Sequence, residues 1–228
     1  MFSRYDRDSL IEVIHRYLSD ETTAFKLDEA LSEIGAKTTD ETVEQVVGLL
    51  WQLYDDCQDH KVVASKEEWD FFQRLILVLK SDADIVAETG KRTWTARQAV
   101  AAVYLGLFGL AVVKTGFGNH LYCATVPLGI ISMLVAHWRS CVEARRLRDQ
   151  TALVPFGSVS EMLSLRRKVR NFVKGRYPAR LGGRQIRSPL TSAAMWLHFG
   201  VVWLLFSPVA LVFQALPEPE QKWKVIDT

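Results

Sequence analysis

The chain has 228 residues, a length that suits one or two domains. It is 49% hydrophobic and 24% charged with a formal net charge of +2, which excludes a disordered or collagen-like chain. Its three cysteines, Cys57, Cys123 and Cys141, are too few for a disulfide scaffold and lack the spacing of paired zinc ligands. Residues 4–8 include four charged side chains and the first long apolar run begins near residue 96, so we expect no cleaved signal peptide.

Charge is distributed in blocks along the chain. Residues 1–90 hold 9 Lys/Arg and 20 Asp/Glu, residues 91–138 hold 4 and 0, residues 139–187 hold 13 and 3, and residues 188–228 hold 2 and 3. Acid-free apolar stretches beside a short basic segment are typical of an integral membrane protein. We therefore predict an all-α fold with four parts: a small acidic soluble helical domain (1–90), a transmembrane hairpin (91–138), a basic cytoplasmic loop (139–187), and a third transmembrane helix with a short tail (188–228).

The acidic N-terminal third contains repeated helix-start signals. Ser or Thr followed three residues later by Glu fits a capping box, and this occurs in Ser9/Glu12, Thr38/Glu41 and Ser65/Glu68. Each pair precedes apolar residues at helical spacing. A further helix, Ala24–Ile34, is expected to end at Gly35, where glycine suits a C-terminal cap. These signals predict four helices.

One polar string in this region has the residue types of a metal site. Asp55, Asp59 and His60 could supply ligands to a divalent ion. No second acidic or histidine cluster completes a coordination sphere, so we favour a solvated helix end and linker. We find no nucleophile motif or phosphate-binding glycine loop and predict no catalytic residue, no metal and no cofactor.

Two apolar stretches between Glu88 and Glu143 predict a transmembrane hairpin. Arg97 and Lys114 bound the first stretch, and at the helical rise they lie roughly 26 Å apart, close to the hydrocarbon thickness of a bilayer. The second stretch is about Leu121–Trp138, and a polar turn at residues 116–120 separates the two. A buried hairpin of a soluble protein is the less favoured alternative, because both stretches are apolar on all sides.

Small residues predict how the two spans pack. Small side chains let helices approach closely in lipid, where apolar burial gives no special advantage. We expect this helix-packing role for Ala102, Gly106 and Gly109 in the first span and for Gly129 and Ser132 in the second. Pro127 is expected to kink the second span.

The third predicted span, about Ser192–Leu216, contains a histidine. An ionisable residue inside an apolar span is a candidate functional residue, so His198 is noted together with His137 at the end of the second span. A haem held by both would need them at matched depth. His198 is expected roughly 10 Å deeper than His137, and we favour a hydrogen-bonded structural histidine.

The basic loop predicts the orientation. Short loops rich in Lys and Arg stay in the cytoplasm, which places residues 139–187 on that side of the plasma (inner) membrane. Cations before the first span place the N-terminal domain on the same face. With three spans, the tail Glu218–Thr228 is expected on the opposite face.

Within this loop the sequence predicts an amphipathic helix that starts at Ser158 and Glu161. Its apolar stripe is Met162, Leu165, Val169, Phe172 and Val173, and its flanking cations are Arg166, Arg167, Lys168, Arg170 and Lys174. Such a helix is typical of the membrane interface, with cations toward anionic lipid. Nucleic acid is a less favoured partner, because the two flanking spans hold the loop at a bilayer.

Three functions are compatible with these features. The favoured one is a non-enzymatic membrane protein whose acidic domain binds a cytosolic protein and anchors or signals it to the membrane. The second is an immunity-type protein or an effector that oligomerises and permeabilises the bilayer, and the third is a metal-dependent enzyme using Asp55–His60. A further hypothesis is that the acidic domain and anionic lipid compete for the cations of the basic loop. We favour the alternative that both charge blocks are simply solvated.

Overall fold

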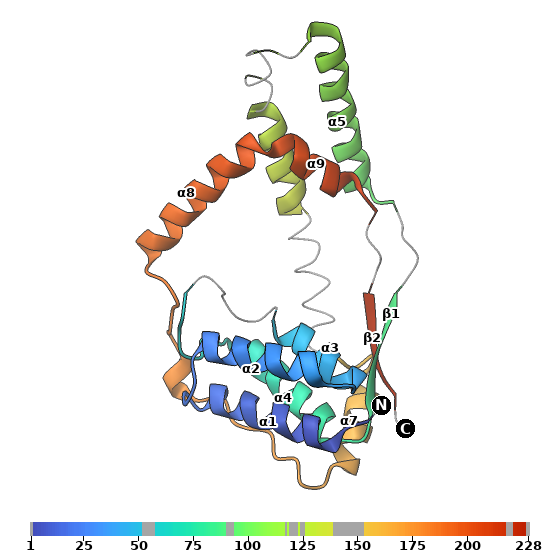
Figure 1. Cartoon of the computed structure of the whole chain (residues 1–228), viewed down its shortest axis with the longest axis vertical. Coiled ribbons are helices and arrows are strands. Elements are labelled where there is room, and N and C mark those ends of the chain that lie inside the picture. The colour runs from blue at the N-terminus through green and yellow to red at the C-terminus, as the bar shows by residue number, and fades with distance from the viewer. Residues whose placement is uncertain are drawn as a thin grey trace. The chain divides into compact units, whose positions relative to one another are not determined.

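A computed structural model of the chain describes residues 2–51, 58–89, 94–116, 118, 123, 126–138, 153–217 and 221–226. The described chain is mostly helical, as predicted, and divides into two compact units (Figure 1). Unit 1 comprises Met1–Glu88, Asp149–Ile186 and Gln221–Thr228, and unit 2 comprises Thr89–Arg148 and Arg187–Glu220. Most of the basic loop therefore belongs to the same unit as the acidic N-terminal third.

Four helices form the core of unit 1 within residues 2–80, as the sequence predicts. They are α1 (Arg4–Leu18), α2 (Ala24–Lys37), α3 (Glu41–Leu50) and α4 (Lys66–Lys80). Helix α1 contacts the other three, and α3 contacts both α2 and α4. Each helix carries apolar residues on its inward side, and Leu10, Leu31, Val46 and Leu75 are fully buried there.

The starts of these helices test the capping predictions one by one. The box at Ser65 and Glu68 is confirmed, with both reciprocal hydrogen bonds present. Helix α1 begins earlier than predicted, after Ser3. The added residues include Arg7, which is buried in the core. Asp40, two residues after the predicted Thr38, caps α3. Helix α2 continues through Gly35 to Lys37.

Two strands were not predicted. Strand β1 (Asp84–Thr89) and strand β2 (Gln221–Ile226) pair in a two-stranded sheet (Figure 1). Both segments contain β-branched residues in short runs, a pattern that suits strands when a partner is available. Val225 is buried in the core of unit 1.

This pairing corrects the predicted placement of the C-terminal tail. Strand β1 follows α4 directly, and β2 belongs to the same unit. Strands that exchange main-chain hydrogen bonds lie about 5 Å apart, so a bilayer cannot separate them. The prediction that the tail lies on the opposite face from the N-terminal helices is therefore wrong.

The basic segment, defined here as residues 153–186, wraps onto unit 1. It contains α7 (Val159–Lys168) and the short helix η1 (Ala179–Leu181). Phe156, Leu165 and Leu181 are buried in the same core as the four N-terminal helices. Met162, Val169 and Phe172 from the predicted lipid-facing stripe also pack against that core. The prediction that this stripe inserts into lipid is corrected: four of its five residues pack in or against the protein core, and Val173 is exposed.

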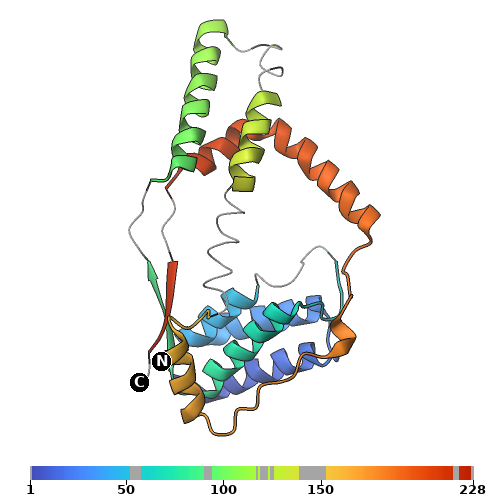
Figure 2. The ribbon, with the colours of Figure 1, turned by 180° about the vertical axis from the view of Figure 1, so that it is seen from behind.

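Unit 2 holds the apolar helices. Its described part contains α5 (Ala96–Thr115), the helix Val126–Trp138, α8 (Pro189–Leu205) and α9 (Ser207–Ala215). Helix α5 packs along α9, and α8 and α9 meet at a bend of 80°. In both views α8 and α9 slope away from this bend, and α5 extends past it (Figures 1 and 2).

Length and hydropathy identify α5 as a candidate membrane span. Among the described residues, α5 alone passes this test as one helix, and α8 with α9 pass it only when taken together. The described helix within the second predicted span, Val126–Trp138, is apolar but shorter. One or two candidate spans are therefore present, and three separate spans stay a prediction.

Candidate interaction site

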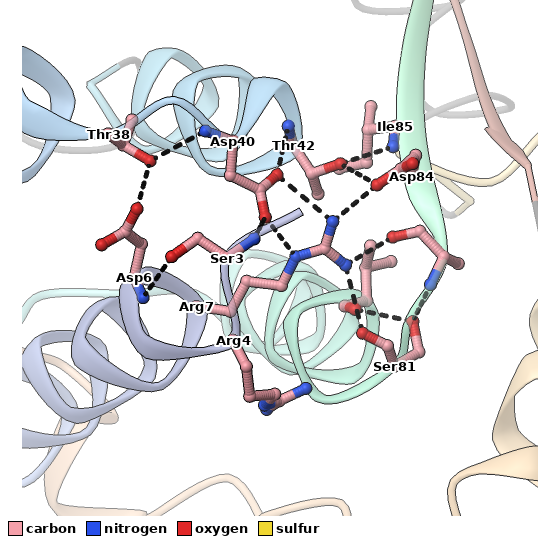
Figure 3. A network of polar contacts seen from close by, with 12 residues as sticks. Ser3, Arg4, Asp6, Arg7, Thr38, Asp40, Thr42, Ser81, Asp84 and Ile85 are labelled. Carbon is pink, nitrogen blue, oxygen red and sulfur yellow. Dashed lines mark hydrogen bonds and ion pairs between the residues drawn. The ribbon is translucent and has the colours of Figure 1, made fainter. Parts of the chain in front are cut away.

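The most buried charged residue in the described part of unit 1 is Arg7, which is fully enclosed (Figure 3). Its Nε donates to Asp40 Oδ2 at 2.8 Å, and its Nη2 donates to Asp40 Oδ1 at 3.2 Å and to Asp84 Oδ1 at 2.6 Å. Its Nη1 donates to the main-chain oxygens of Ser81 at 3.1 Å and Ala83 at 2.7 Å. All five guanidinium N–H donors are therefore used.

Thr42 extends this network to the first strand. Its hydroxyl donates to Asp84 Oδ1 at 3.0 Å and accepts the N–H of Ile85 at 3.1 Å (Figure 3). The network therefore joins α1, the start of α3 and the start of β1. Because β1 leads into α5, these contacts fix the point where the chain leaves unit 1.

The charge balance of this network lowers one pKa. Burial alone would raise the pKa of Asp40, but hydrogen bonds from Arg7 and from the N–H groups of Ser3 and Thr42 outweigh that effect. The pKa of Asp40 therefore lies below its ordinary value. With its donors satisfied internally, Arg7 serves as a structural anchor.

A second set of contacts attaches the basic segment to α4. The indole Nε1 of Trp69 donates to the main-chain oxygen of Gly175 at 2.9 Å, and the N–H of Gly175 donates to Gln73 Oε1 at 2.8 Å. The Tyr177 hydroxyl donates to the oxygen of Ala64 at 3.0 Å, and its ring meets that of Trp69 edge to face. A Cβ at position 175 would lie 3.2 Å from Gln73 Oε1, so this approach favours glycine.

Ion pairs attach the C-terminal part of the basic segment to the end of α1. Asp20, just after α1, accepts from Arg184 Nη1 at 2.8 Å and lies 3.5 Å from Arg180 Nε. The hydrogen bond from Arg184 is the main reason why the pKa of Asp20 lies below its ordinary value. Arg180 also donates to the oxygen of Leu18 at 2.9 Å, and Arg184 donates to that of Val62 at 3.1 Å. No local pattern predicts these contacts, because the partners are 122 to 164 residues apart.

The five cations predicted to face lipid remain on the surface. Arg166, Arg167, Lys168, Arg170 and Lys174 are all exposed. Lys174 forms an ion pair with Asp70 of α4 at 2.8 Å. Contact of these cations with anionic lipid stays a prediction, now without insertion of the apolar stripe beside them.

The attachment changes the charge balance of unit 1. Residues 1–88 carry a formal charge of −11, and residues 149–186 return +6 to the same unit. The cations of the basic segment contact α4 and the end of α1. Residues 24–50, which form α2 and α3, hold 2 Lys and 6 Asp/Glu. Phe25 and Trp51, at the ends of this stretch, are nearly half exposed.

The small residues predicted to pack in unit 2 fall into two groups. Gly129 and Ser132 are buried, and a Cβ at position 129 would lie 2.4 Å from Leu204 Cδ2. Ala102, Gly106 and Gly109 are exposed, and nothing described lies within 4 Å of a Cβ built on either glycine. Among the described residues, α5 packs through Ala101, Tyr104, Leu105 and Phe108 against Leu128 and Leu211. The packing role of Ala102, Gly106 and Gly109 stays a prediction.

Ser132 is the centre of a polar cluster in this apolar unit. Trp203 Nε1 donates to Ser132 Oγ at 3.0 Å, and Ser132 Oγ donates to Gln214 Oε1 at 3.1 Å. Gln214 Nε2 donates back to the main-chain oxygen of Ser132 at 3.2 Å. The cluster joins the helix Val126–Trp138 to both arms of the bent pair. Sequence reasoning missed it, although a lone Gln in an apolar run was a usable signal.

The residues of the metal hypothesis have separate positions. Asp59 accepts the N–H of Phe25 at 3.1 Å and so caps α2, and His60 Nδ1 lies 2.7 Å from the main-chain oxygen of Lys61. Asp55 lies outside the described residues. In the described part of the chain, no three His, Cys, Asp or Glu side chains are grouped for a metal ion. His198, on α8, is exposed and packs edge to face with Phe199.

The site thus combines a buried arginine anchor, an internally attached basic segment and three exposed acids on α2 and α3, which are Glu29, Glu41 and Glu44. No family model, no curated protein and no solved structure matches the chain.

Proposed function

We propose that this protein is a non-enzymatic membrane-anchored adaptor whose acidic surface on α2 and α3 binds a basic partner protein in the cytosol. The observation that supports it is the position of exposed acids on these two helices. Lys174, Arg180 and Arg184 of the basic segment pair with Asp70 and Asp20, which lie outside α2 and α3. Three acids of α2 and α3, Glu29, Glu41 and Glu44, are exposed.

The chemistry of this surface defines the partner. Glu29, Glu41 and Glu44 are exposed on α2 and α3, and Phe25 and Trp51 add exposed aromatic surface. Exposed acids steer a basic protein toward the surface, and buried aromatic anchors supply most of the affinity. A partner with Lys or Arg around an apolar patch fits both features.

Anchoring is supported by unit 2. Residues 188–217 contain no Asp, Glu, Lys or Arg, and the described side chains of α8 include no buried one. Helix α5 has the length and hydropathy of a span. Exposed apolar surface of this extent is costly in water and is relieved in a bilayer.

The adaptor proposal is tested with the full chain in its native membrane. The double variant Glu41→Gln/Glu44→Gln is compared with wild type and with Glu67→Gln, which alters an exposed acid on α4. Cross-linking from an inserted photoreactive residue at Ala36, which is exposed on α2, should yield a salt-sensitive adduct with a basic protein. The adduct should be lost in the double variant and retained in Glu67→Gln. An adduct that persists equally in all three chains would overturn the proposal.

The effector hypothesis is supported by an observation that it shares with the anchoring argument: no described side chain of α8 is buried. It is separated from the adaptor by reconstituting the full chain in vesicles that contain phosphatidylglycerol and an encapsulated dye. The adaptor leaves the dye inside at any protein density. Release that rises steeply with the number of chains per vesicle would favour the effector.

A further inference from the structure

We propose that α8 and α9 form a re-entrant element, which enters and leaves the bilayer through the leaflet beside unit 1 and is surrounded by the acyl chains of that leaflet. Both chain termini then lie on one face of the membrane. This inference rests on the membrane location in the proposed function, but not on the partner.

The connectivity of the chain places both ends of each apolar segment in unit 1. The chain passes between the units at four points, after Glu88, Arg148, Ile186 and Glu220. Each of the two excursions into unit 2 therefore begins and ends in unit 1. Because unit 1 contains a continuous core and a sheet that joins β1 to β2, it lies on one side of any bilayer. Both excursions must then cross the membrane an even number of times.

Helix α9 ends beside the start of α5. Gln98, in the first turn of α5, donates from Nε2 to the main-chain oxygen of Leu216, just after α9, at 3.1 Å. The start of α5 and the end of α9 are therefore at the same depth. If α5 begins at one interface, α9 ends at that interface.

Helix α9 is too short to cross a bilayer, whereas α5 is long enough. Helix α5 has 20 residues and is about 30 Å long, which matches the hydrocarbon core. Helix α9 has 9 residues and is about 14 Å long. From its end at the interface it reaches less than half of the bilayer, and α5 extends beyond the bend in both views (Figures 1 and 2). The 80° bend then directs α8 away from the far leaflet.

Polar groups at the bend form hydrogen bonds within the protein. A broken helix in lipid must satisfy its freed polar groups within the protein. Ser207 Oγ donates to the oxygen of Leu204 at 3.0 Å, and the N–H of Ala210 donates to the oxygen of Phe206 at 3.0 Å. The Trp203–Ser132–Gln214 cluster fixes both arms to the neighbouring helix. The bend is thus a built feature that is compatible with an apolar environment.

The surface of α8 and α9 is apolar and exposed. Trp196, Leu197, Phe206 and Phe213 are all more than half exposed, on both arms. Residues 188–217 contain no charged residue, Arg184 and Arg187 precede α8, and Glu218, Glu220, Lys222 and Lys224 follow α9. Charged residues at both ends and none between them suit an element whose ends share one headgroup layer.

The test uses single cysteines in the full chain, with Cys57, Cys123 and Cys141 changed to Ser. The sites are Tyr5→Cys in unit 1, Lys224→Cys on β2, Gly118→Cys after α5 and Phe206→Cys at the bend. A membrane-impermeant maleimide is applied to right-side-out and inside-out vesicles. A lipid-soluble maleimide shows that each cysteine is reactive.

We expect Tyr5→Cys and Lys224→Cys to be labelled from one face and Gly118→Cys from the other. Phe206→Cys should react only with the lipid-soluble reagent or after detergent is added. Labelling of Lys224→Cys from the Gly118 face would overturn the inference. Labelling of Phe206→Cys by the impermeant reagent from either face would do the same.

Alkaline carbonate extraction of the same vesicles separates the two proposals. A chain that is released by carbonate has no membrane anchor, which contradicts the proposed function together with the inference. A chain that stays in the membrane but shows labelled Phe206→Cys contradicts the inference alone.

Discussion

The carboxylate of Glu161, in the first turn of α7, accepts the main-chain N–H of Val225 in strand β2 at 2.8 Å. The same side chain accepts the N–H of Gly157 at 2.9 Å. One residue of the basic segment therefore holds both the start of its own helix and the last strand of the chain.

Replacing Glu161 by Gln should loosen β2. An amide offers one acceptor oxygen where the carboxylate offers two, so one of the two N–H donors loses its partner. We expect hydrogen–deuterium exchange at Val225 to accelerate roughly tenfold, which corresponds to about 1.4 kcal/mol. Glu67→Gln, in the first turn of α4, is the matched control and should leave this exchange unchanged. Equal exchange in both variants would show that Glu161 does not hold the strand.

Replacing Arg7 by Ala should destabilise unit 1 severely. The change leaves Asp40 and Asp84 without their shared cation, and breaking a buried ion pair typically costs about 3–5 kcal/mol. Urea unfolding of the full chain in detergent micelles measures this change. Arg4→Ala removes an exposed pair with Asp8 on the same helix and should cost less than about 0.5 kcal/mol. A similar midpoint for the two variants would contradict the anchoring role of Arg7.

Leu165 and Leu163 distinguish a protein-facing from a lipid-facing α7. Leu165 is buried in the core of unit 1, whereas Leu163 is 42% exposed on the same helix. Leu165→Ala should lower the free energy of unfolding in micelles by about 2–5 kcal/mol. Leu163→Ala should change it by no more than about 0.5 kcal/mol. If both variants keep wild-type stability and instead lose affinity for anionic vesicles, the apolar stripe faces lipid after all.

Acid should weaken the folded unit 1. The pKa values of Asp20 and Asp40 lie below the ordinary value of 3.8. A carboxyl with a depressed pKa in the folded state stabilises that state above the unfolded pKa, and this stabilisation is lost as the pH falls through the folded pKa. The urea midpoint should therefore decrease below pH 3.8. Asp20→Asn should start from a lower midpoint and lose less on acidification, and a wild-type slope in this variant would exclude Asp20 as a source.

Two glycines of unit 2 should respond differently to the same change. Gly129→Leu places a side chain against Leu204, so the helix Val126–Trp138 must move away from the bend. Gly106→Leu adds a side chain where nothing described lies within 4 Å. Cross-linking between Met133→Cys and Gly200→Cys by a short bifunctional reagent should fall in the first variant and persist in the second. Loss in both variants would restore the predicted packing role of Gly106.

Local signals in the sequence were sufficient for the four N-terminal helices. Ser65 and Glu68 lie within one helical turn of each other, so the local sequence alone predicts the hydrogen bonds between them. The strands depend on a partner far along the chain, because Ile85 and Val225 become strand residues only through their pairing. No local pattern contains that information.

The basic segment shows a different limit. An apolar stripe flanked by cations has the same spacing whether it covers a protein core or a membrane. Leu165 therefore fits both readings, and Trp69 and Gln73 of α4 decide between them by binding Gly175. Likewise, Gly106 and Gly129 have the same pattern of small residues in the sequence. They differ in the structure because Leu204 packs against Gly129, and nothing described lies within 4 Å of a Cβ at Gly106.

The composition of unit 1 from three separate stretches has a consequence for synthesis. The core is complete only when β2, at residues 221–226, has joined β1. A ribosome delivers the four helices first, then α5 and the helix Val126–Trp138, the basic segment and the bent pair, and the closing strand last. Unit 2 is therefore synthesised in full before unit 1 can close, and a chain truncated before Gln221 should leave Val225's place in the core empty.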